Sequence, residues 1–412
     1  MDRVLFRNVH VFDGSGAAPF AAEVLVEGPK IKELRRGSAL EAGDARVIDG
    51  GGNTLMPGLI DFHLHLGFGS TVEQITKPGQ RSDAENALLM AHCGRVLLDH
   101  GYTAGHSGGS NSVEAEIAAA RAFESGLVPG PRLRTSSFER VASGTMAPGT
   151  PQAGAAQRAQ NVATVVKFVD EMADIGVDAV KFLLNGVSAF DPGANGRELF
   201  HDAEVMAAGE AARRRNIELT AHCYTAHSVK LAIRAGFRNL YHCMYLDDEA
   251  LDLLAANRDR LFVGPAPGIV EADLLRAPRF GIMASDAQRA EQADGVSCIQ
   301  RAGRAMRERG VRLIPGGDYG FAWNPIGTNA RDIELFVEWF GFSHAEALRA
   351  ATAVGAEGLA MGDRLGRVQN GYLADLLLVK GDPSANVSLL RDKANLVAVM
   401  QNGRFHKAPA QS

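Results

Sequence analysis

Short apolar runs and longer amphipathic segments alternate along most of the chain. Apolar runs bounded by Gly, Pro and polar residues are typical of buried strands, and they occur at 59–63, 102–106, 132–136, 179–183, 218–222, 239–243, 261–263 and 312–315. Between most of them lie alanine-rich amphipathic segments, at 84–99, 113–125, 161–175, 202–215, 225–235 and 287–309. Strands that alternate with helices predict βαβ units and a parallel sheet. Eight such units predict an α/β fold of the closed (β/α)8 TIM-barrel type.

An open doubly wound sheet is the alternative arrangement of βαβ units. Its phosphate-binding pattern G-x-G-x-x-G does not follow the first predicted strand. The closed barrel is therefore the expected fold. Three long loops, at 66–83, 137–160 and 264–286, are expected at the rim where the strands end.

The two ends of the chain have a different pattern. Residues 1–57 contain short strand-like runs separated by turns, with no helical period, and strand-like runs return at 374–379 and 397–401. We expect both ends to join in one small β-sandwich domain, formed by residues 1–57 plus 366–412. Residues 58–365 would form the (β/α)8 barrel domain.

Composition and charge exclude several classes of function. The 412 residues are 46% hydrophobic and 22% charged, which is typical of a globular α/β protein. A net charge of −5 gives no basic surface for nucleic acid, and no apolar run is long enough to span a membrane. The N-terminus lacks the pattern of a signal peptide, which predicts a cytoplasmic protein. The four cysteines have no C-x-x-C spacing and are expected to be free thiols, with Cys223 and Cys243 in packing roles.

Candidate metal ligands stand at the ends of the predicted strands. His63 and His65 are two residues apart on a strand, so their side chains project to the same side. One such histidine alone is more often a satisfied core residue than a ligand. However, other strand ends supply further residues suited to a metal centre, namely Lys181, His222, His242 and Asp318. Catalytic residues of a barrel come from the ends of several strands, so the set favours a metal centre.

These residues resemble the amidohydrolase superfamily, in particular its imidazolonepropionase-like and prolidase-like metal-dependent hydrolases. The segments that flank the set fit this resemblance too: LMPGLID at 55–61, LGRV at 365–368 and GYLAD at 371–375. The resemblance covers nearly the whole chain. It implies a barrel that holds one or two metal ions and a β sandwich built from the first and last segments.

The resemblance also implies a role for each candidate residue. His63 and His65 would bind a buried metal ion, and His222 and His242 a more exposed one. Lys181 would bridge the two ions as a lysine carboxylated by CO2, and Asp318 would be both a ligand and the proton shuttle. Tyr224 occupies the position of a hydrogen-bond donor to the oxyanion. We expect two divalent ions, with zinc as the metal.

The chemistry of these groups supports those roles. An ammonium group cannot bind a cation, but a lysine buried beside metal charge loses its proton. Two divalent ions lower the pKa of a bridging water, so that hydroxide forms near neutral pH. Asp318 can then move the proton to the leaving nitrogen. The sequence thus predicts hydrolysis of an amide, peptide-like or cyclic amide C–N bond by a metal-bridging hydroxide.

Two other functions are the alternatives. A mononuclear deaminase or ring hydrolase would act on a heteroaromatic or cyclic amidine substrate, and such enzymes usually lack the bridging lysine. Lys181 therefore discriminates between the two. A non-catalytic scaffold on the same barrel would have lost ligands, whereas all six positions are filled here.

Substrate specificity is less well defined by the sequence. Dipeptidase-like relatives commonly have Glu-His-Gly around the strand-six ligand and Gly-Gly-His in the third loop, whereas this chain has Tyr241-His242-Cys243 and the third-loop segment SGTM at 143–146. These differences put peptidase specificity in doubt. The candidate substrate contacts at the predicted rim are His106, Tyr224, Phe321, Trp323 and Asn324. The expected partner is a small-molecule substrate, with no nucleic acid and no membrane, and we expect a homo-oligomer.

Overall fold

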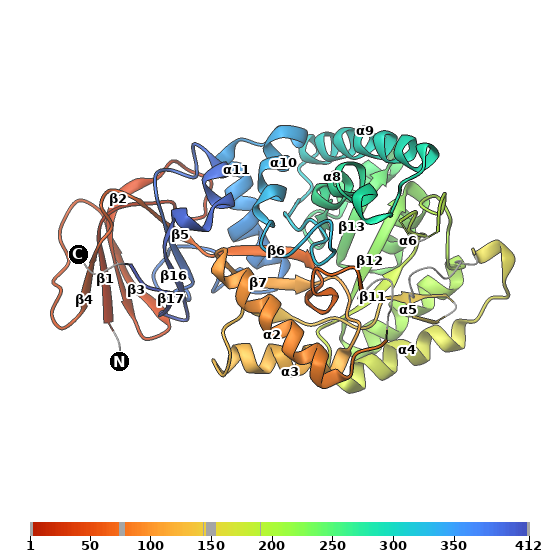
Figure 1. Ribbon diagram of the computed structural model, residues 1–412, viewed down its shortest axis with the longest axis horizontal. Helices are drawn as coiled ribbons and strands as arrows, with labels where there is room; N and C mark the ends of the chain where they lie inside the picture. Colours follow the sequence, from red (N-terminus) through yellow and green to blue (C-terminus); the bar gives the residue numbers. More distant parts are fainter. Residues whose placement is uncertain (1–2, 74–78, 143, 146–153, 190, 410–412) are drawn as a thin grey trace.

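The chain forms a β sheet from both of its ends and a larger α/β unit beside that sheet (Figure 1). The computed structural model describes residues 3–73, 79–142, 144–145, 154–189 and 191–409. Within these ranges, no helix is long and apolar enough to cross a membrane.

The end sheet has eight strands, five from the first part of the chain and three from the last. They are β1 (Arg3–Val11), β2 (Phe20–Glu27), β3 (Lys30–Arg35), β4 (Arg46–Asp49), β5 (Thr54–Pro57), β15 (Leu376–Val379), β16 (Leu396–Gln401) and β17 (Arg404–Lys407). The order is β17-β16-β15-β5-β1-β2-β3, and β4 also pairs with β1. β5 joins the two parts, since it pairs antiparallel with β15 and parallel with β1. Strands from both ends thus share one sheet, as the sequence predicted.

The α/β unit contains two further sheets. The first has the order β6-β7-β8 and the second β10-β9-β11-β12-β13-β14. Their strands are β6 (Leu59–Leu64), β7 (Tyr102–Ser107), β8 (Arg132–Arg134), β9 (Arg140–Val141), β10 (Gly144–Thr145), β11 (Ala179–Leu183), β12 (Glu218–Thr225), β13 (Asn239–Tyr245) and β14 (Phe262–Gly264). Apart from the β9–β10 pair, neighbouring strands run parallel.

A few backbone hydrogen bonds connect the two sheets at both of their edges. On one side, the backbone N–H of Ala179 donates to the carbonyl of Thr135 at 3.1 Å, just beyond β8. On the other side, Ile314 N–H donates to Val263 at 2.9 Å, and Phe62 N–H donates to Pro315 at 3.1 Å. The segment predicted as the eighth strand, 312–315, therefore lies between β14 and β6. It forms bridges but no regular strand.

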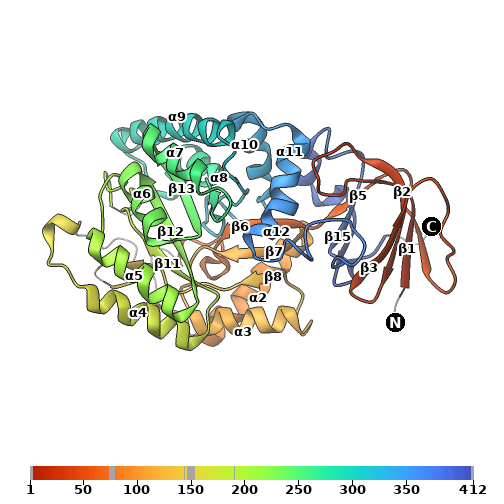
Figure 2. The same ribbon diagram turned by 180° about the vertical axis from the view of Figure 1, so that it is seen from behind.

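Six helices of the α/β unit occur where amphipathic segments were predicted. They are α2 (Asp83–Asp99), α3 (Val113–Glu124), α4 (Val162–Ile175), α5 (Asp202–Arg215), α6 (Ala226–Ala235) and α9 (Asp286–Glu308). Five further helices lie outside the predicted segments, namely α7 (Asp248–Ala256), α8 (Pro267–Leu275), α10 (Ala330–Phe340), α11 (His344–Arg349) and α12 (Gly355–Gly358). Shorter helical turns are 3-10 at Leu66–Phe68, Ala155–Gln157, Ala277–Phe280, Val387–Arg391 and Lys393–Asn395, and π at Ala350–Val354. Consecutive helices α4 to α7 pack against one another outside the strands (Figure 2).

The stretch 264–286 was predicted as a long loop, and this prediction is wrong. It contains α8, which begins with Pro267 at its first position, where the missing N–H of proline costs nothing. Eight of its nine side chains are buried or partly buried, so the helix has no polar face for a sequence pattern to reveal.

Candidate metal centre

His63 and His65 lie side by side at the end of β6, with their ring centroids 5.3 Å apart. Both are almost completely buried. Nδ1 of His65 lies 2.9 Å from the carbonyl oxygen of Gly109, to which it donates. This contact fixes the ring and leaves Nε2 free to act as a ligand, as is usual for metal-binding histidines.

His222 and His242 come from the two neighbouring strands β12 and β13, and their ring centroids are 4.5 Å apart. The backbone of His242 has a φ of 73° and that of Cys243 a φ of 51°, at the point where the β12–β13 register shifts. Left-handed backbone at residues other than glycine is costly and concentrates at functional sites. Here it lets the His242 ring approach His63, at a centroid distance of 5.3 Å.

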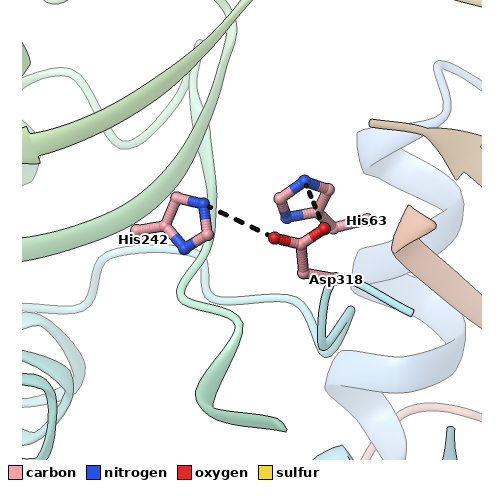
Figure 3. Close-up of side chains that lie close together, drawn as sticks. All are labelled: His63, His242 and Asp318. Carbon is pink, nitrogen blue, oxygen red and sulfur yellow. Dashed lines mark ion pairs between the residues drawn. The ribbon is translucent and has the colours of Figure 1, made fainter. Parts of the chain in front are cut away.

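Asp318 lies between these histidines (Figure 3). Its Oδ1 is 2.9 Å from Nε2 of His65 and 3.5 Å from Nε2 of His63. Its Oδ2 is 3.9 Å from Nε2 of His242. The approach of its loop to β6 requires Gly316, because a Cβ at that position would collide with the backbone N of His63.

Lys181 on β11 is fully buried beside the same histidines. Its Nζ lies 3.5 Å from Nε2 of His63 and 4.2 Å from the ring centroid of Tyr241. Among the residues described, no carboxylate forms an ion pair with it. Burial therefore lowers the pKa of Lys181 to about 8, so that the neutral amine is available near neutral pH.

The donor set fits a divalent metal. Nε2 of His222 and both ring nitrogens of His242 are buried without a hydrogen-bond partner among the described residues, although unpaired buried polar atoms are costly. One ligand atom from each of His63, His242 and Asp318 lies within 4.8 Å of the others. Burial lowers the pKa of His63, His222 and His242 well below the usual value, which keeps these three imidazoles neutral, as a ligand must be. Burial also lowers the pKa of His65, but the hydrogen bond with Asp318 outweighs it and raises this pKa above its usual value. Imidazole nitrogen and carboxylate oxygen are the ligands of catalytic zinc.

Tyr224 stands next to the rings of His222 and His242, at centroid distances of 4.3 and 4.9 Å. Its backbone N–H donates to Oδ1 of Asn185 at 2.7 Å, which fixes the end of β12. Burial raises the pKa of the Tyr224 phenol well above its usual value. The hydroxyl therefore stays protonated and can donate a hydrogen bond.

Two predicted substrate contacts belong to an aromatic wall beside His65. The wall consists of Phe68, Phe321 and Trp323. The Phe68 ring stacks on His65 with its centroid 4.3 Å away, and Phe321 lies 5.2 Å from Phe68. Trp323 stacks on Phe321 at 5.1 Å.

The other two predicted contacts have positions that were not expected. Asn324 is fully buried, and its Nδ2 donates to the carbonyl of Gly317 at 2.7 Å, so it supports the loop of Asp318. The rim position predicted for His106 is wrong, because its Nε2 lies 3.3 Å from Nδ2 of Asn239, at the start of β13. Strand alternation places His106 inside the α/β unit, below the metal centre, where burial lowers its pKa to about 3.

Sequence reasoning missed several residues of the site. Tyr241 stacks on His63 at 3.9 Å, and a Cβ on Gly108 would lie 2.8 Å from Nε2 of His65 and collide with the His63 ring. Glu139 and Asp273 add two carboxylates that the predicted set does not contain. The Gly108-Gly109 pair after a strand was a usable signal of close approach, whereas nothing marked the two acids. Of the third-loop segment, Ser143 and Met146 lie outside the described residues.

Comparison with known proteins identifies the family of this chain. Residues 54–405 match the model of the Amidohydrolase family, so the chain belongs to this family. It is 25% identical to the ochratoxinase of Aspergillus niger over 86% of this chain and 76% of that one. It is 26% identical to the imidazolonepropionase of Cereibacter sphaeroides strain KD131 over 95% of this chain and 96% of that one. The crystal structure of a Xaa-Pro dipeptidase with bound methionine superimposes with a TM-score of 0.84, at 25% identity, and covers 99% of this chain and all of that one (100%).

The resemblance to the amidohydrolase superfamily is therefore confirmed. The protein is a metal-dependent hydrolase that acts on C–N bonds, as its sequence predicted. The metal, the number of ions and the role of each ligand stay predictions.

Proposed function

We propose that the protein hydrolyses an amide, peptide-like or cyclic amide C–N bond with the help of two divalent ions. Zinc is the expected metal. His63 and His65 would hold one ion, His222 and His242 the other, with carboxylated Lys181 between them and Asp318 as the last ligand. The observation that carries the proposal is the set of buried ring nitrogens without partners around a lysine without a counter-ion.

The proposal includes the architecture in which these residues meet. We infer a (β/α)8 barrel in which segment 312–315 closes the ring between β14 and β6, supported by the hydrogen bonds at both edges of the sheets. The end sheet would form the β sandwich, with 1–57 plus 366–412 as one domain and 58–365 as the other. The cytoplasmic location and the homo-oligomeric state belong to the same set of predictions.

The metal ions would act as Lewis acids on the scissile carbonyl and lower the pKa of water. Asp318 is suited to move the proton. Burial raises the pKa of its carboxyl, but the hydrogen bond from His65 outweighs burial and holds the pKa below its usual value, so the group is ionised and can accept a proton. From the same position Asp318 returns that proton to the leaving nitrogen.

Tyr224 is placed to stabilise the carbonyl oxygen as it gains negative charge. Its ring lies against the rings of His222 and His242, and it comes from the strand end that carries His222. A fixed donor of this kind acts without reorganisation during the reaction.

Metal analysis of Lys181→Ala tests this proposal against the mononuclear deaminase. We expect about two metal ions per chain in the unaltered protein and one or none in the variant, because a bridging anion is lost. Lys167→Ala, at an exposed position of α4, is the matched control and should keep both ions. Chelated protein should also need bicarbonate, as well as zinc, to recover the second ion and amide hydrolysis.

The opposite result would favour the alternative. One ion per chain that survives Lys181→Ala, together with release of ammonia from a heteroaromatic amine, would exclude the bridged hydrolase. The deaminase has no specific geometric support here, because the lysine that such enzymes usually lack is present and buried in the site.

A further inference from the structure

Tyr241 is a fully buried residue of β13 that the proposed ligand set does not contain. It directly precedes His242. Successive side chains of a strand normally point to opposite faces. Here both rings approach His63, since the ring centroids of Tyr241 and His242 lie 3.9 and 5.3 Å from that of His63. The left-handed backbone of His242, with a φ of 73°, interrupts the alternation and allows both contacts.

One face of the Tyr241 ring supports two of the proposed ligands. The His63 ring is nearly parallel to it, with 18° between the two planes. Nζ of Lys181 lies 4.2 Å from the centroid of the Tyr241 ring. Because Nζ is also only 3.5 Å from Nε2 of His63, it lies on the same face of the ring as the imidazole. A ring face has no hydrogen-bond donor, so this support leaves the lone pairs of both nitrogens available to a metal ion.

His63 lacks the hydrogen bond that orients its neighbour. The His65 ring is fixed by the contact of its Nδ1 with the carbonyl of Gly109, whereas Nδ1 of His63 is buried without a hydrogen-bond partner among the described residues. Metal-binding histidines usually donate this second N–H to a fixed acceptor. For His63, the stack on Tyr241 is the contact that can set the orientation of the ring.

The Tyr241 ring is itself held at its edges. Phe62 packs against it in a T-shaped arrangement, with the two centroids 6.0 Å apart. On β14, a Cβ at Gly264 would lie 3.0 Å from Cδ1 of Tyr241, so only glycine leaves the ring its full space. Since protein interiors are close-packed, a ring enclosed in this way has little freedom to move.

The far end of the ring is fixed by His106. The Tyr241 hydroxyl lies 3.1 Å from Nδ1 of His106. This Nδ1 is also 2.9 Å from the carbonyl of Ser107, which can only accept, so Nδ1 carries the hydrogen. Nε2 of His106 accepts from the side-chain amide of Asn239 at 3.3 Å. The Ser107 carbonyl and the Tyr241 oxygen therefore share the Nδ1 hydrogen of a neutral His106.

We infer that Tyr241 is a positioning residue of the metal centre. Its ring holds the His63 imidazole and the Lys181 side chain in the arrangement that a metal ion requires, and His106 fixes the ring. This inference rests on the proposed function, since it concerns the metal site of that proposal. It gives a role to a side chain that would bind neither metal nor substrate and acts through two of the ligands.

The zinc affinity of the chelated protein tests the inference without any substrate. Tyr241→Leu removes the ring face, and we expect zinc binding to weaken by about 10- to 100-fold, the usual effect of losing a residue that orients a ligand. Phe237→Leu is the matched control, because it also removes a fully buried ring, one that packs against Phe182 in the hydrophobic core. This control should bind zinc like the unaltered protein. Competition with a coloured chelator measures each affinity.

A second pair of variants tests the contact with His106. Tyr241→Phe keeps the ring and loses the hydroxyl, so zinc binding should weaken by only about 2- to 10-fold, the effect of one hydrogen bond. Tyr372→Phe is its control, since it removes a hydroxyl that donates to the carbonyl of Gly362 at 3.1 Å. This variant should keep the zinc affinity unchanged.

The outcomes distinguish the inference from the proposed function. Unaltered zinc affinity in Tyr241→Leu, or an equal loss in Phe237→Leu, would overturn the inference and leave the proposed function standing. If the unaltered protein, after chelation, binds neither zinc nor another divalent ion, the proposed function fails and the inference with it. Should Tyr241→Leu not fold, equal zinc affinities of Tyr241→Phe and Tyr372→Phe would overturn the inference.

Discussion

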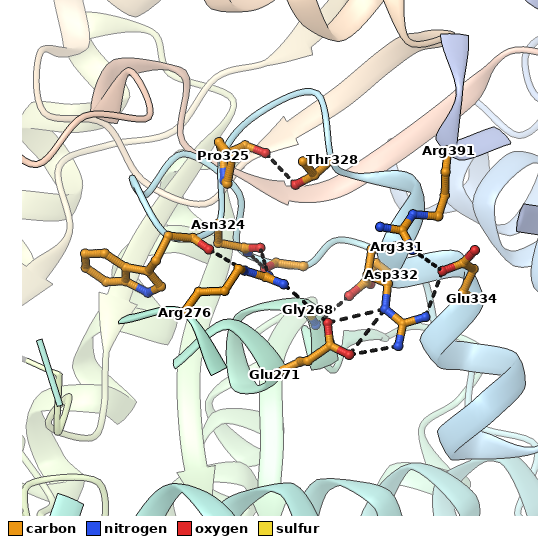
Figure 4. A network of polar contacts seen from close by, with 12 residues as sticks. Gly268, Glu271, Arg276, Asn324, Pro325, Thr328, Arg331, Asp332, Glu334 and Arg391 are labelled. Atoms are coloured by element: carbon orange, nitrogen blue, oxygen red, sulfur yellow. Dashed lines mark hydrogen bonds and ion pairs between the residues drawn. The ribbon is translucent and has the colours of Figure 1, made fainter. Parts of the chain in front are cut away.

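The α/β unit contains two neighbouring clusters of buried polar groups. They differ in whether the protein itself supplies the hydrogen-bond partners of these groups. In the support cluster (Asp61, Glu271, Asn329, Arg331 and Asp332), every carboxylate oxygen of the two aspartates has a donor within the protein. Asp61 accepts from the His63 N–H at 2.9 Å and from Nδ2 of Asn329 at 2.7 Å. Asp332 accepts from the N–H groups of Gly268 and Gly316, both at 2.8 Å. Figure 4 shows the part of this cluster around Asp332, where Glu271 also forms an ion pair with Arg331 at 2.8 Å.

The metal centre is the opposite case. Nε2 of His222 and both nitrogens of His242 are equally buried but have no hydrogen-bond partner in the part of the chain that the structure describes. Since an unpaired buried polar group costs about 1–3 kcal/mol, a cluster of them is retained only for another purpose. The ligand side chains thus keep nitrogen atoms without hydrogen-bond partners in the described protein, whereas the support cluster fixes the loops that carry the ligand side chains. The two clusters should therefore respond differently to substitution.

The largest effect is expected for Asp318→Asn, which removes the proton-transfer group. We expect kcat/KM for an amide substrate to fall by about 10³-fold or more, within the range for loss of general acid–base catalysis. The thermal midpoint should change little, because the asparagine occupies the same space. Asp286→Asn, on the exposed start of α9, should retain full activity. A loss of activity matched by unfolding would assign Asp318 to the support cluster instead.

Asp332→Ala should show the reverse behaviour. It leaves the buried N–H groups of Gly268 and Gly316 without an acceptor, which is expected to lower the free energy of unfolding by about 2–4 kcal/mol. Urea denaturation measures this loss. Asp248→Ala at an exposed position is the control. Full stability in Asp332→Ala would show that the support cluster does not hold the fold.

A smaller effect is expected for Tyr224→Phe. The ring and its contacts with His222 and His242 remain, and only the hydroxyl is lost. We expect kcat to fall by about 10- to 100-fold with little change in KM, because the donor acts on charge that develops in the transition state. Steady-state kinetics separate the two constants. A rise in KM alone would make Tyr224 a binding residue.

The last effect concerns pH. Burial raises the pKa of Asp332 from 3.8 to about 7 in the folded protein. A raised pKa means that this carboxyl contributes stability below its unfolded pKa, and that the contribution is lost as the pH rises through about 7. As the pH rises from 4 to 8, the free energy of unfolding of the chelated protein should therefore fall relative to that of Asp332→Asn. Urea unfolding at several pH values measures the difference, and parallel curves would contradict the assignment.

The sequence predicted the residues at regular strand ends better than those on loops. His63, His65, His222 and His242 follow apolar runs whose pairing is local and parallel, so their meeting could be expected from strand order. His106 also ends such a run, but the pattern does not say whether a residue lies above or below the site. Its side chain is in fact directed to Asn239.

The acids of the loops could not be found in the same way. Glu139 and Asp273 reach the site through the path of a loop and through α8, which nothing in a hydrophobic pattern describes. Their positions depend on what surrounds them, namely Gly109 without a side chain and the indole of Trp323. Such neighbours are far apart in the sequence and are known only from the fold.

The position of β5 has a consequence for how the protein is made. β5 needs β15 as its antiparallel partner, and the whole α/β unit is synthesised between the two. At 5–20 residues per second, this interval is on the order of half a minute. During that time β5 presents an unpaired edge, which is the kind of surface on which nascent chains associate wrongly. Formation of the end sheet thus begins before the α/β unit is translated and can be completed only after it.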